Sequence, residues 1–297
     1  MNNVKIYQFG GTSPAPWYRV GGINQMVGYA IVTGNGKIIL IDGGYDDDAA
    51  YLLRYLKYLA NGKPVISAWF FTHLHGDHTD AFAEIVKNRF DEIEIENIYY
   101  SFPEREEMAD FGASFDTYDR FFENFDRFSD IVHEVKVGDV ITVDNVSLEI
   151  LFTPKARYST SKNVNNSSLV LRMDACGQSV MFLADLAEPA GADFLKETSP
   201  EKLKADIVQM AHHGQNGVNR NVYEAIGAKC CLWNAPDWLW ENDAGKGYNT
   251  HGFQTIIVRK WMQEMGVKHH LVAKNGTQVL TLPADFNDFG WGQEEEA

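Results

Sequence analysis

The chain has 297 residues, of which 45% are hydrophobic and 23% charged, a composition that excludes a disordered or fibrous protein. With 26 basic and 41 acidic residues, its formal net charge is −15. Such a surface repels nucleic acid and anionic membranes, which argues against long nucleic acid as a substrate.

Other global features bear on domain number and location. No internal repeat or low-complexity stretch divides the chain, so we expect one domain over 1–297 with an acidic tail over 290–297. Three cysteines do not make a disulfide framework. The first residues, Met1–Ile6, lack the basic and apolar parts of a signal peptide, and no run of about 18 apolar residues predicts a membrane span. These features together predict a cytoplasmic protein.

The N-terminal part is predicted to be strands joined by glycine turns. Residues 28–33 and 37–41 form a hairpin around Gly34-Asn35-Gly36, and the second strand ends at Asp42-Gly43-Gly44. Asp46 or Asp47 then caps a helix that runs to about Ala60. The continuous apolar run 65–71 predicts a buried strand.

Aromatic residues distinguish the next part of the chain. After a short helix over 79–88, the segment 104–132 is acidic and aromatic, with large rings at the spacing of one helical face from Phe111 onward. We expect a helical insertion that packs on the core, because large apolar side chains are usually interior. The alternative is an aromatic lid or substrate wall.

The remaining chain alternates strands with helices, which favours a layered α/β fold. The predicted strands are 137–142, 146–152, 168–172, 180–183, 207–211, 229–233, 267–273 and 277–282, and the predicted helices are 220–226 and 253–265.

Three histidines and an aspartate lie within one short segment, His73-Leu74-His75-Gly76-Asp77-His78. In an extended chain His73 and His75 point to the same side. Gly76 permits a sharp turn, after which Asp77 and His78 reach a second position close by. Imidazole nitrogen and carboxylate oxygen are both zinc donors. The segment therefore predicts a pair of metals that share a bridging water.

This segment resembles the His-x-His-x-Asp-His signature of the metallo-β-lactamase superfamily. Three further segments resemble that family in the right order: the turn at Asp42-Gly43-Gly44, Ala184-Asp185-Leu186, which is similar to the segment supplying a carboxylate between both metals, and the late motif Ala211-His212-His213-Gly214. The resemblance covers essentially the whole chain. It implies a four-layer αββα sandwich, two β-sheets flanked by helices.

The resemblance also implies roles for two residues around the metals. A carboxylate at Asp42 is expected to accept a hydrogen bond from a ligating histidine or a loop amide rather than to bind metal. Asn166 stands where many members carry another metal-binding histidine. Either the amide oxygen of Asn166 binds the metal instead, or water takes the position of the absent histidine, or the metal at that position is weakly bound.

The late motif leaves a choice between two ligands. His212 and His213 point to opposite sides if their strand continues. Matching Gly214 to the glycine that follows the family's ligand favours His213 as the ligand, with His212 facing the substrate. His251 either faces a bound anion or is a turn residue before the next helix. His133, His269 and His270 are interpreted as surface or packing residues.

Two sequence features narrow the resemblance to one group. The segment Asn165–Val170, and Tyr248–Gly252 followed by a helix and Lys274-Asn275-Gly276-Thr277, resemble the hydrolase domain of DNA-uptake competence channel proteins. They are also similar to teichoic acid phosphorylcholine esterases, which are phosphodiesterases.

The resemblance implies a metallo-hydrolase with two zinc ions per chain, or manganese or iron, held by His73, His75, Asp77, His78, Asp185 and His213. A metal-bound hydroxide attacks a small phosphodiester, Asp77 orients it, and His212 or His251 donates to the leaving group or to a non-bridging oxygen. One alternative is hydrolysis of a lactone, lactam or thioester on the same metals. The other is a catalytically silent metal-dependent sensor or binding module.

Three tryptophans follow a predicted strand, in Trp233-Asn234-Ala235-Pro236-Asp237-Trp238-Leu239-Trp240. Aromatic rings beside carboxylates bind quaternary ammonium groups such as choline. We favour the alternative, a packed loop anchored by its tryptophans.

Overall fold

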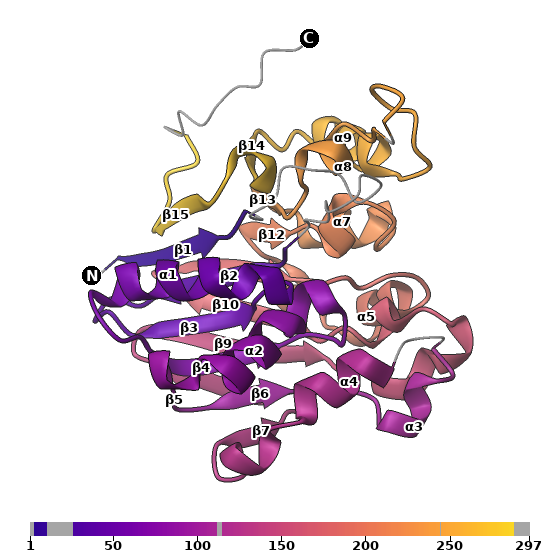
Figure 1. Cartoon of the computed structure of the whole chain (residues 1–297). Helices are drawn as coiled ribbons and strands as arrows, with labels where there is room; N and C mark the ends of the chain where they lie inside the picture. Colours follow the sequence, from indigo (N-terminus) through magenta and orange to yellow (C-terminus); the bar gives the residue numbers. More distant parts are fainter. Residues whose placement is uncertain (1–2, 11–25, 112–114, 244, 288–297) are drawn as a thin grey trace.

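The computed structural model describes residues 3–10, 26–111, 115–243 and 245–287, so the predicted acidic tail lies outside the described residues. Two mixed β-sheets lie face to face, and helices cover the outer side of each sheet (Figure 1). The predicted four-layer arrangement is therefore confirmed.

The first sheet has the strand order β15-β1-β2-β3-β4-β6-β7, with β5 beside β4. Its strands are β1 (Val4–Gln8), β2 (Gly28–Val32), β3 (Ile38–Asp42), β4 (Val65–Phe71), β5 (Glu94–Ile95), β6 (Ile98–Tyr100), β7 (Val132–Glu134) and β15 (Gln278–Leu282). The C-terminal strand β15 pairs antiparallel with β1, Val4 opposite Leu282. Strands from the two ends of the described chain are thus neighbours at one edge of this sheet.

The second sheet has the order β14-β13-β12-β11-β10-β9-β8. Its strands are β8 (Val140–Val143), β9 (Val146–Phe152), β10 (Val170–Ala175), β11 (Gln178–Phe182), β12 (Ile207–Gln209), β13 (Cys230–Trp233) and β14 (His269–Val272). From β11 to β14 the strands run parallel, so their carboxyl ends lie at one edge. That edge carries part of the candidate site.

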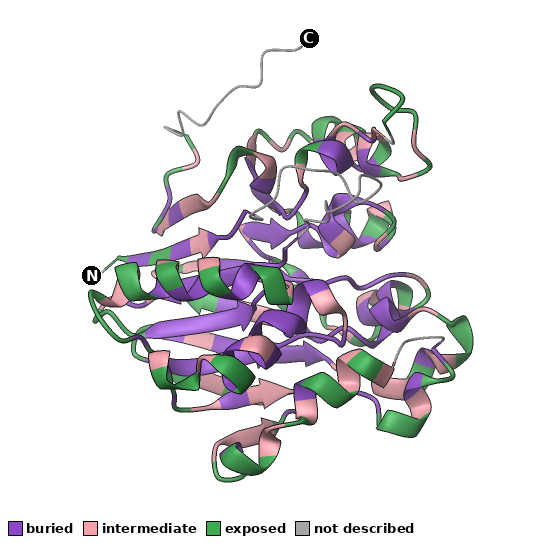
Figure 2. Cartoon of the chain, viewed as in Figure 1, coloured by how far each residue is buried: buried purple, intermediate pink, exposed green. Residues whose placement is uncertain are grey.

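Helices fill the two outer layers. The α-helices are α1 (Ala49–Ala60), α2 (Gly76–Asn88), α3 (Arg105–Met108), α4 (Phe115–Phe122), α5 (Ala190–Glu197), α6 (Pro200–Leu203), α7 (Arg220–Ile226), α8 (Asp237–Trp240) and α9 (Thr255–Glu264). One apolar core lies between the sheets, and a second and third lie between each sheet and its helices. Figure 2 accordingly shows buried strands beneath helices whose outer faces are exposed. In the part of the chain that the structure describes, no helix is long and apolar enough to cross a membrane.

The aromatic segment packs against the first sheet. Phe121 of α4 is buried, with its ring centroid 4.9 Å from that of Phe71 in β4 and 5.1 Å from that of Phe82 in α2. The helices here are short, since α4 ends at Phe122 and a separate 3-10 turn covers Phe125–Phe128. The contacts of Phe121 support the packing interpretation, whereas the single helical face expected over the segment is broken into short pieces.

Candidate metal centre

The predicted site residues converge where strands of both sheets end. The histidine segment follows β4 of the first sheet, and Asp185 follows β11 of the second. His213 comes four residues after the end of β12, which lies parallel to β11. Because a loop follows each strand end, these side chains face one another rather than packing within a sheet.

A first group consists of His73, His75 and Asp185, whose donor atoms all lie within 4.8 Å of one another. The Nε2 atom of His73 is 3.1 Å from Nδ1 of His75 and 3.9 Å from Oδ2 of Asp185. Three donors facing a common point are one short of the four that zinc usually takes.

A second group consists of Asp77, His78, Asp185 and His213, whose donor atoms also lie within 4.8 Å of one another. The Nε2 atom of His213 is 3.1 Å from Oδ2 of Asp77 and 3.3 Å from Oδ2 of Asp185. Nε2 of His78 is 3.3 Å from Oδ1 of Asp185. Asp185 is thus common to both groups.

The second group contains buried polar atoms that have no hydrogen-bond partner: Asp77 Oδ2, His78 Nε2, Asp185 Oδ1 and His213 Nε2. One such atom comes from each member of the group. A buried polar atom without a partner is costly, and four of them facing one point form a set of donors suited to a cation. Imidazole and carboxylate donors of this kind fit a divalent metal.

The charge states agree with this interpretation. Burial lowers the pKa of His73 well below its usual range and also lowers that of His75, so both rings are neutral and able to bind metal. Burial also acts to lower the pKa of His213, but Asp185 and Asp77 beside it raise that pKa to about 10. A proton therefore balances these carboxylates in the second group, the place that a metal cation would take.

The segment after β4 turns earlier than expected. Helix α2 begins at Gly76, whereas the sequence predicted a helix only from residue 79. Asp77 and His78 therefore lie in the first helical turn, which places them on a different side from His73 and His75. His75 itself is extended and precedes the helix.

Asp42, the last residue of β3, fixes the orientation of the His78 ring. Its Oδ2 lies 2.8 Å from Nδ1 of His78, and Oδ1 accepts the backbone N–H of Thr72 at 2.9 Å. The Thr72 hydroxyl donates to the same Oδ2 at 2.8 Å. A carboxylate can only accept, so Nδ1 of His78 donates to Asp42, and Nε2 is turned toward the group.

A second support, Asn234, was not predicted from the sequence. Nδ1 of His213 donates to the backbone carbonyl of Asn234 at 3.1 Å, and the buried hydroxyl of Tyr29 donates to Oδ1 of the same asparagine. Tyr29 lies on β2 and Asn234 follows β13, so the pair joins the two sheets. Nothing in the local sequence of either residue indicates this contact.

The late histidines do not continue a strand, and the strand predicted over 207–211 is two residues shorter than expected. Strand β12 ends at Gln209, and both His212 and His213 have positive φ angles of 50° and 59°. Gly214 follows with a φ of 83°, and a Cβ there would collide with the Trp233 ring. The turn brings His213 into the second group, whereas His212 belongs to neither group.

Asn165, rather than Asn166, faces the site. Nδ2 of Asn165 lies 3.1 Å from Nε2 of His212. Asn166 is turned to other partners: its nitrogen donates to Ser161 Oγ and to the Glu188 carbonyl, and its oxygen accepts from the Ala190 amide. Because these contacts use both ends of its amide, the idea that the Asn166 oxygen binds metal is not supported.

His251 lies in the loop after α8 and is also outside both groups. Its ring stacks on Phe253 with the centroids 4.0 Å apart. The loop is tied to the late motif through Asn216, whose side chain accepts the Gln254 amide and whose carbonyl accepts from His212. A substrate-facing role for His251 stays a prediction.

The three tryptophans are packed, as favoured from the sequence. Trp233, Trp238 and Trp240 are all buried. Arg259 lies over the Trp240 ring at 4.0 Å from its centroid, and Lys274 lies at 5.4 Å. Protein cations already occupy this ring face, so it does not offer a choline site.

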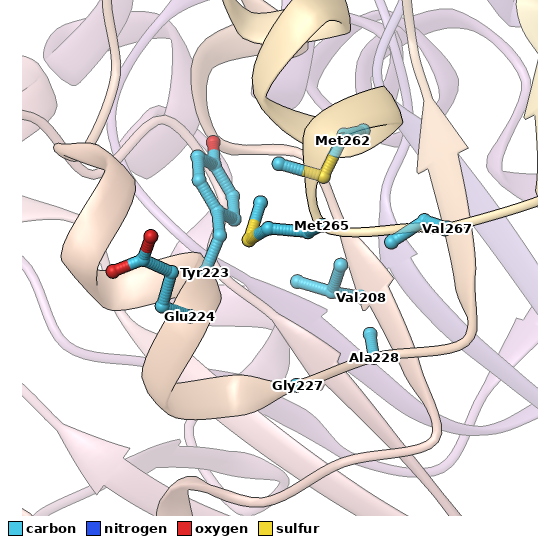
Figure 3. A pocket seen from close by; sticks show the side chains of 8 residues that line it. All are labelled: Val208, Tyr223, Glu224, Gly227, Ala228, Met262, Met265 and Val267. Carbon is cyan, nitrogen blue, oxygen red and sulfur yellow. The ribbon is translucent and has the colours of Figure 1, made fainter.

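A cavity of about 230 Å³ lies elsewhere, between α7, α9 and the second sheet (Figure 3). Its lining is mostly apolar: Val208, Tyr223, Glu224, Gly227, Ala228, Met262, Met265 and Val267. No member of the two His/Asp groups lines it.

Comparisons with known proteins agree with this fold and site. Residues 26–155 match the family model described as the metallo-beta-lactamase superfamily. No match was found among curated proteins. The structure is similar to that of the metallo-beta-lactamase fold protein YhfI from Bacillus subtilis, with a TM-score of 0.54 and 14% identity over 94% of this chain and 99% of that chain.

Two further solved structures are similar. One is a variant of the CmlA beta-hydroxylase, with a TM-score of 0.52 and 14% identity over 94% of this chain and 54% of that chain. The other is a diphosphatase from the PhnP family, with a TM-score of 0.49 and 14% identity over 95% of this chain and 98% of that chain. The likeness to YhfI and to the CmlA variant, both with TM-scores above 0.5, shows a shared fold and leaves the reaction open.

The two flanked sheets have the arrangement of the metallo-β-lactamase fold, and residues 26–155 carry the match to the model of that superfamily. The two flanked sheets and the His/Asp groups together define a protein of metallo-hydrolase fold with a site suited to divalent metal.

Proposed function

We propose that the protein is a metal-dependent hydrolase that acts on small phosphodiesters. The observation that carries the proposal is Asp185, a buried carboxylate shared by two groups of donors. The second group presents four buried atoms without hydrogen-bond partners. The Asn165–Val170 and Tyr248–Gly252 segments, which resemble those of phosphodiesterases, support the substrate class.

Zinc is the proposed metal, two ions per chain, and manganese or iron also suit these donors. Bound there, a divalent metal supplies Lewis acidity and a nucleophilic water at neutral pH. His73, His75 and Asp185 would hold one ion, and Asp77, His78, His213 and Asp185 the other.

Further roles fall to four residues of the protein itself: Asp77, His212, Asp42 and Asn234. Asp77 lies in the second group with Oδ2 unpartnered, where a carboxylate can orient the attacking water and accept its proton. His212 lies outside both groups with Nε2 3.9 Å from Oδ2 of Asp185, which suits a ring that contacts the substrate. Asp42 and Asn234 keep His78 and His213 in place.

Charge favours a phosphodiester over the other substrates. The four positive charges of two divalent ions exceed the three negative charges of Asp42, Asp77 and Asp185, so until the attacking water loses its proton the loaded site is positive and attracts an anionic ester. A neutral lactone or thioester gains less from this field. The net charge of −15 outside the site disfavours a long polyanion, which leaves a small diester.

The test compares zinc-loaded protein on bis(4-nitrophenyl) phosphate, a lactone and a thioester. We expect turnover of the diester above the other two, and its loss by about a hundredfold or more in Asp77→Ala and Asp185→Asn. Full activity in both variants would contradict the mechanism. Faster turnover of the lactone or thioester would favour that alternative, and metal binding without turnover of any substrate would favour a silent sensor.

A further inference from the structure

Asn165 lies between the first group and the late motif. It belongs to the 3-10 turn Val164–Ser167 and is 4% exposed. Its nitrogen contacts His212, but its Oδ1 is buried and has no hydrogen-bond partner. An amide oxygen only accepts, so Oδ1 is suited to a metal ion or a donor, whereas the NH₂ group can donate to a ligand oxygen.

Gln215 approaches the same point from the other side. Its Nε2 lies 3.3 Å from Nε2 of His212, while Nδ1 of His212 lies 3.1 Å from the Asn216 carbonyl. A carbonyl only accepts, so Nδ1 carries the proton and Nε2 accepts from the two amides. Each NH₂ group has two hydrogens, so one on each amide remains for another acceptor.

This corner borders the incomplete side of the first group. That group has three donors, and His212 Nε2 lies 3.9 Å from the Asp185 oxygen that both groups use. His212 is not a member of the first group, whose donor atoms all lie within 4.8 Å of one another. It is therefore a neighbour of the group rather than a fourth ligand. Both amides contact this same Nε2 of His212, so Asn165 and Gln215 lie beside the first group.

We propose that Asn165 and Gln215, positioned by His212, donate their remaining N–H groups to a non-bridging oxygen of the substrate beside the first metal position. The inference rests on the proposed function and adds residues that determine specificity. A tetrahedral phosphodiester has two non-bridging oxygens, so one can face the metal position while the other accepts from the amides. A planar carbonyl has a single oxygen, which would have to make both contacts at one atom and carries no negative charge before attack. The corner thus favours tetrahedral anions.

The first experiment locates Asn165 without any turnover. Asn165→Asp keeps the size of the side chain but offers a carboxylate, and Asn166→Asp is the matched control one residue away. Titration with zinc should show binding tightened about tenfold in Asn165→Asp. It should show no tightening in Asn166→Asp, because that side chain is directed to Ser161, Glu188 and Ala190. Equal affinities in the two variants would overturn the placement.

The second experiment measures the binding of inorganic phosphate to zinc-loaded protein. Losing one hydrogen bond in Asn165→Ala or in Gln215→Ala should weaken phosphate binding about three- to tenfold, whereas Asn166→Ala should bind as the parent does. Parental phosphate affinity in both corner variants would overturn the proposal. A failure of the proposed function would give a different result from a failure of this proposal. The diester would not be hydrolysed, although the Asn165→Ala and Gln215→Ala variants would still lose phosphate affinity.

Discussion

His213 and Asn234 are joined by a hydrogen bond that fixes the orientation of the late histidine. Nδ1 of His213 donates to the Asn234 carbonyl at 3.1 Å, so Nε2 is directed at Asp77 and Asp185. Asn234 is in turn held by the Tyr29 hydroxyl, across the junction of the two sheets. The second group therefore depends on a contact between β2 and the end of β13.

Tyr29→Phe should weaken this support while keeping the ring in place. Its hydroxyl is the donor to Asn234 Oδ1, so the variant leaves that oxygen buried and unpaired. We expect a loss of about 1–3 kcal/mol in the free energy of unfolding, measured by urea denaturation, together with weaker zinc binding. Tyr58→Phe, at a tyrosine that is 77% exposed, is the control and should change neither. Unchanged zinc binding in Tyr29→Phe would show that Asn234 holds His213 without it.

Asp42→Asn should lower metal affinity although Asp42 is not in either group. The carboxylate accepts from Thr72 and from Nδ1 of His78, and an amide nitrogen in place of one oxygen would face these donors. We expect zinc affinity to fall by about 10- to 100-fold, measured by competition with a chelating dye. Asp47→Asn, at an exposed position nearby, should bind zinc as the parent does. An Asp42→Asn variant that matches it would remove Asp42 from the metal site.

The chemistry of the site could be predicted from the sequence where it is local. His73 to His78 are consecutive, and the apolar run before them predicted β4 with its observed bounds. Such patterns depend only on residues that are close in the sequence, and hydrophobic periodicity detects them for that reason. The order of the later motifs indicated Asp185 and His213, which the structure brings into the second group.

The remaining features depend on distant contacts or unusual backbone angles. Asn165 and Asn166 are adjacent and chemically identical, and only the fold shows that one faces His212 and the other Glu188. The positive φ angles of His212 and His213 are rare for such residues, so the sequence does not predict the turn that they form. Tyr29 and Asn234 are 205 positions apart, beyond any local pattern.

Replacing a histidine of one group should remove the metal of that group and leave the metal of the other. His75 belongs to the first group and His213 to the second. Elemental analysis of zinc-loaded protein should give about two metal atoms per chain for the parent and about one for His75→Ala or His213→Ala. The control variant His133→Ala, at a half-buried histidine of β7 outside both groups, should keep two. If the parent takes up no metal after loading, the hydrolase proposal fails and the binding module replaces it.

Phe121→Ala should separate packing from a lid role in the aromatic segment. The Phe121 ring is buried against Phe71 and Phe82, so its removal leaves a cavity in the first outer layer. We expect a loss of about 3–5 kcal/mol in the free energy of unfolding. Phe90→Ala, at a ring that is 37% exposed, should cost less. A stable Phe121→Ala protein with altered substrate preference would instead favour the lid.

Asp206 makes a contribution to stability that depends on pH and lies away from the metal site. Burial acts to raise its pKa, but hydrogen bonds from Lys229 and Ser179 outweigh burial, so the pKa lies below its usual value. Oδ1 accepts from Lys229 at 3.0 Å and Oδ2 from the Ser179 amide at 3.1 Å. A carboxyl with a depressed folded pKa stabilises the protein above its unfolded pKa, and this contribution is lost as the pH falls through the folded value.

Asp206→Asn should therefore destabilise the protein by about 1 kcal/mol at neutral pH, with the difference from the parent shrinking below about pH 4. Urea unfolding at both pH values checks this. The matched control is Asp174→Asn, an exposed carboxylate paired with Arg172, which should cost less at neutral pH because solvent screens an exposed pair. A destabilisation by Asp206→Asn that stays constant down to about pH 3 would mean that the lost interaction does not involve the charge of Asp206.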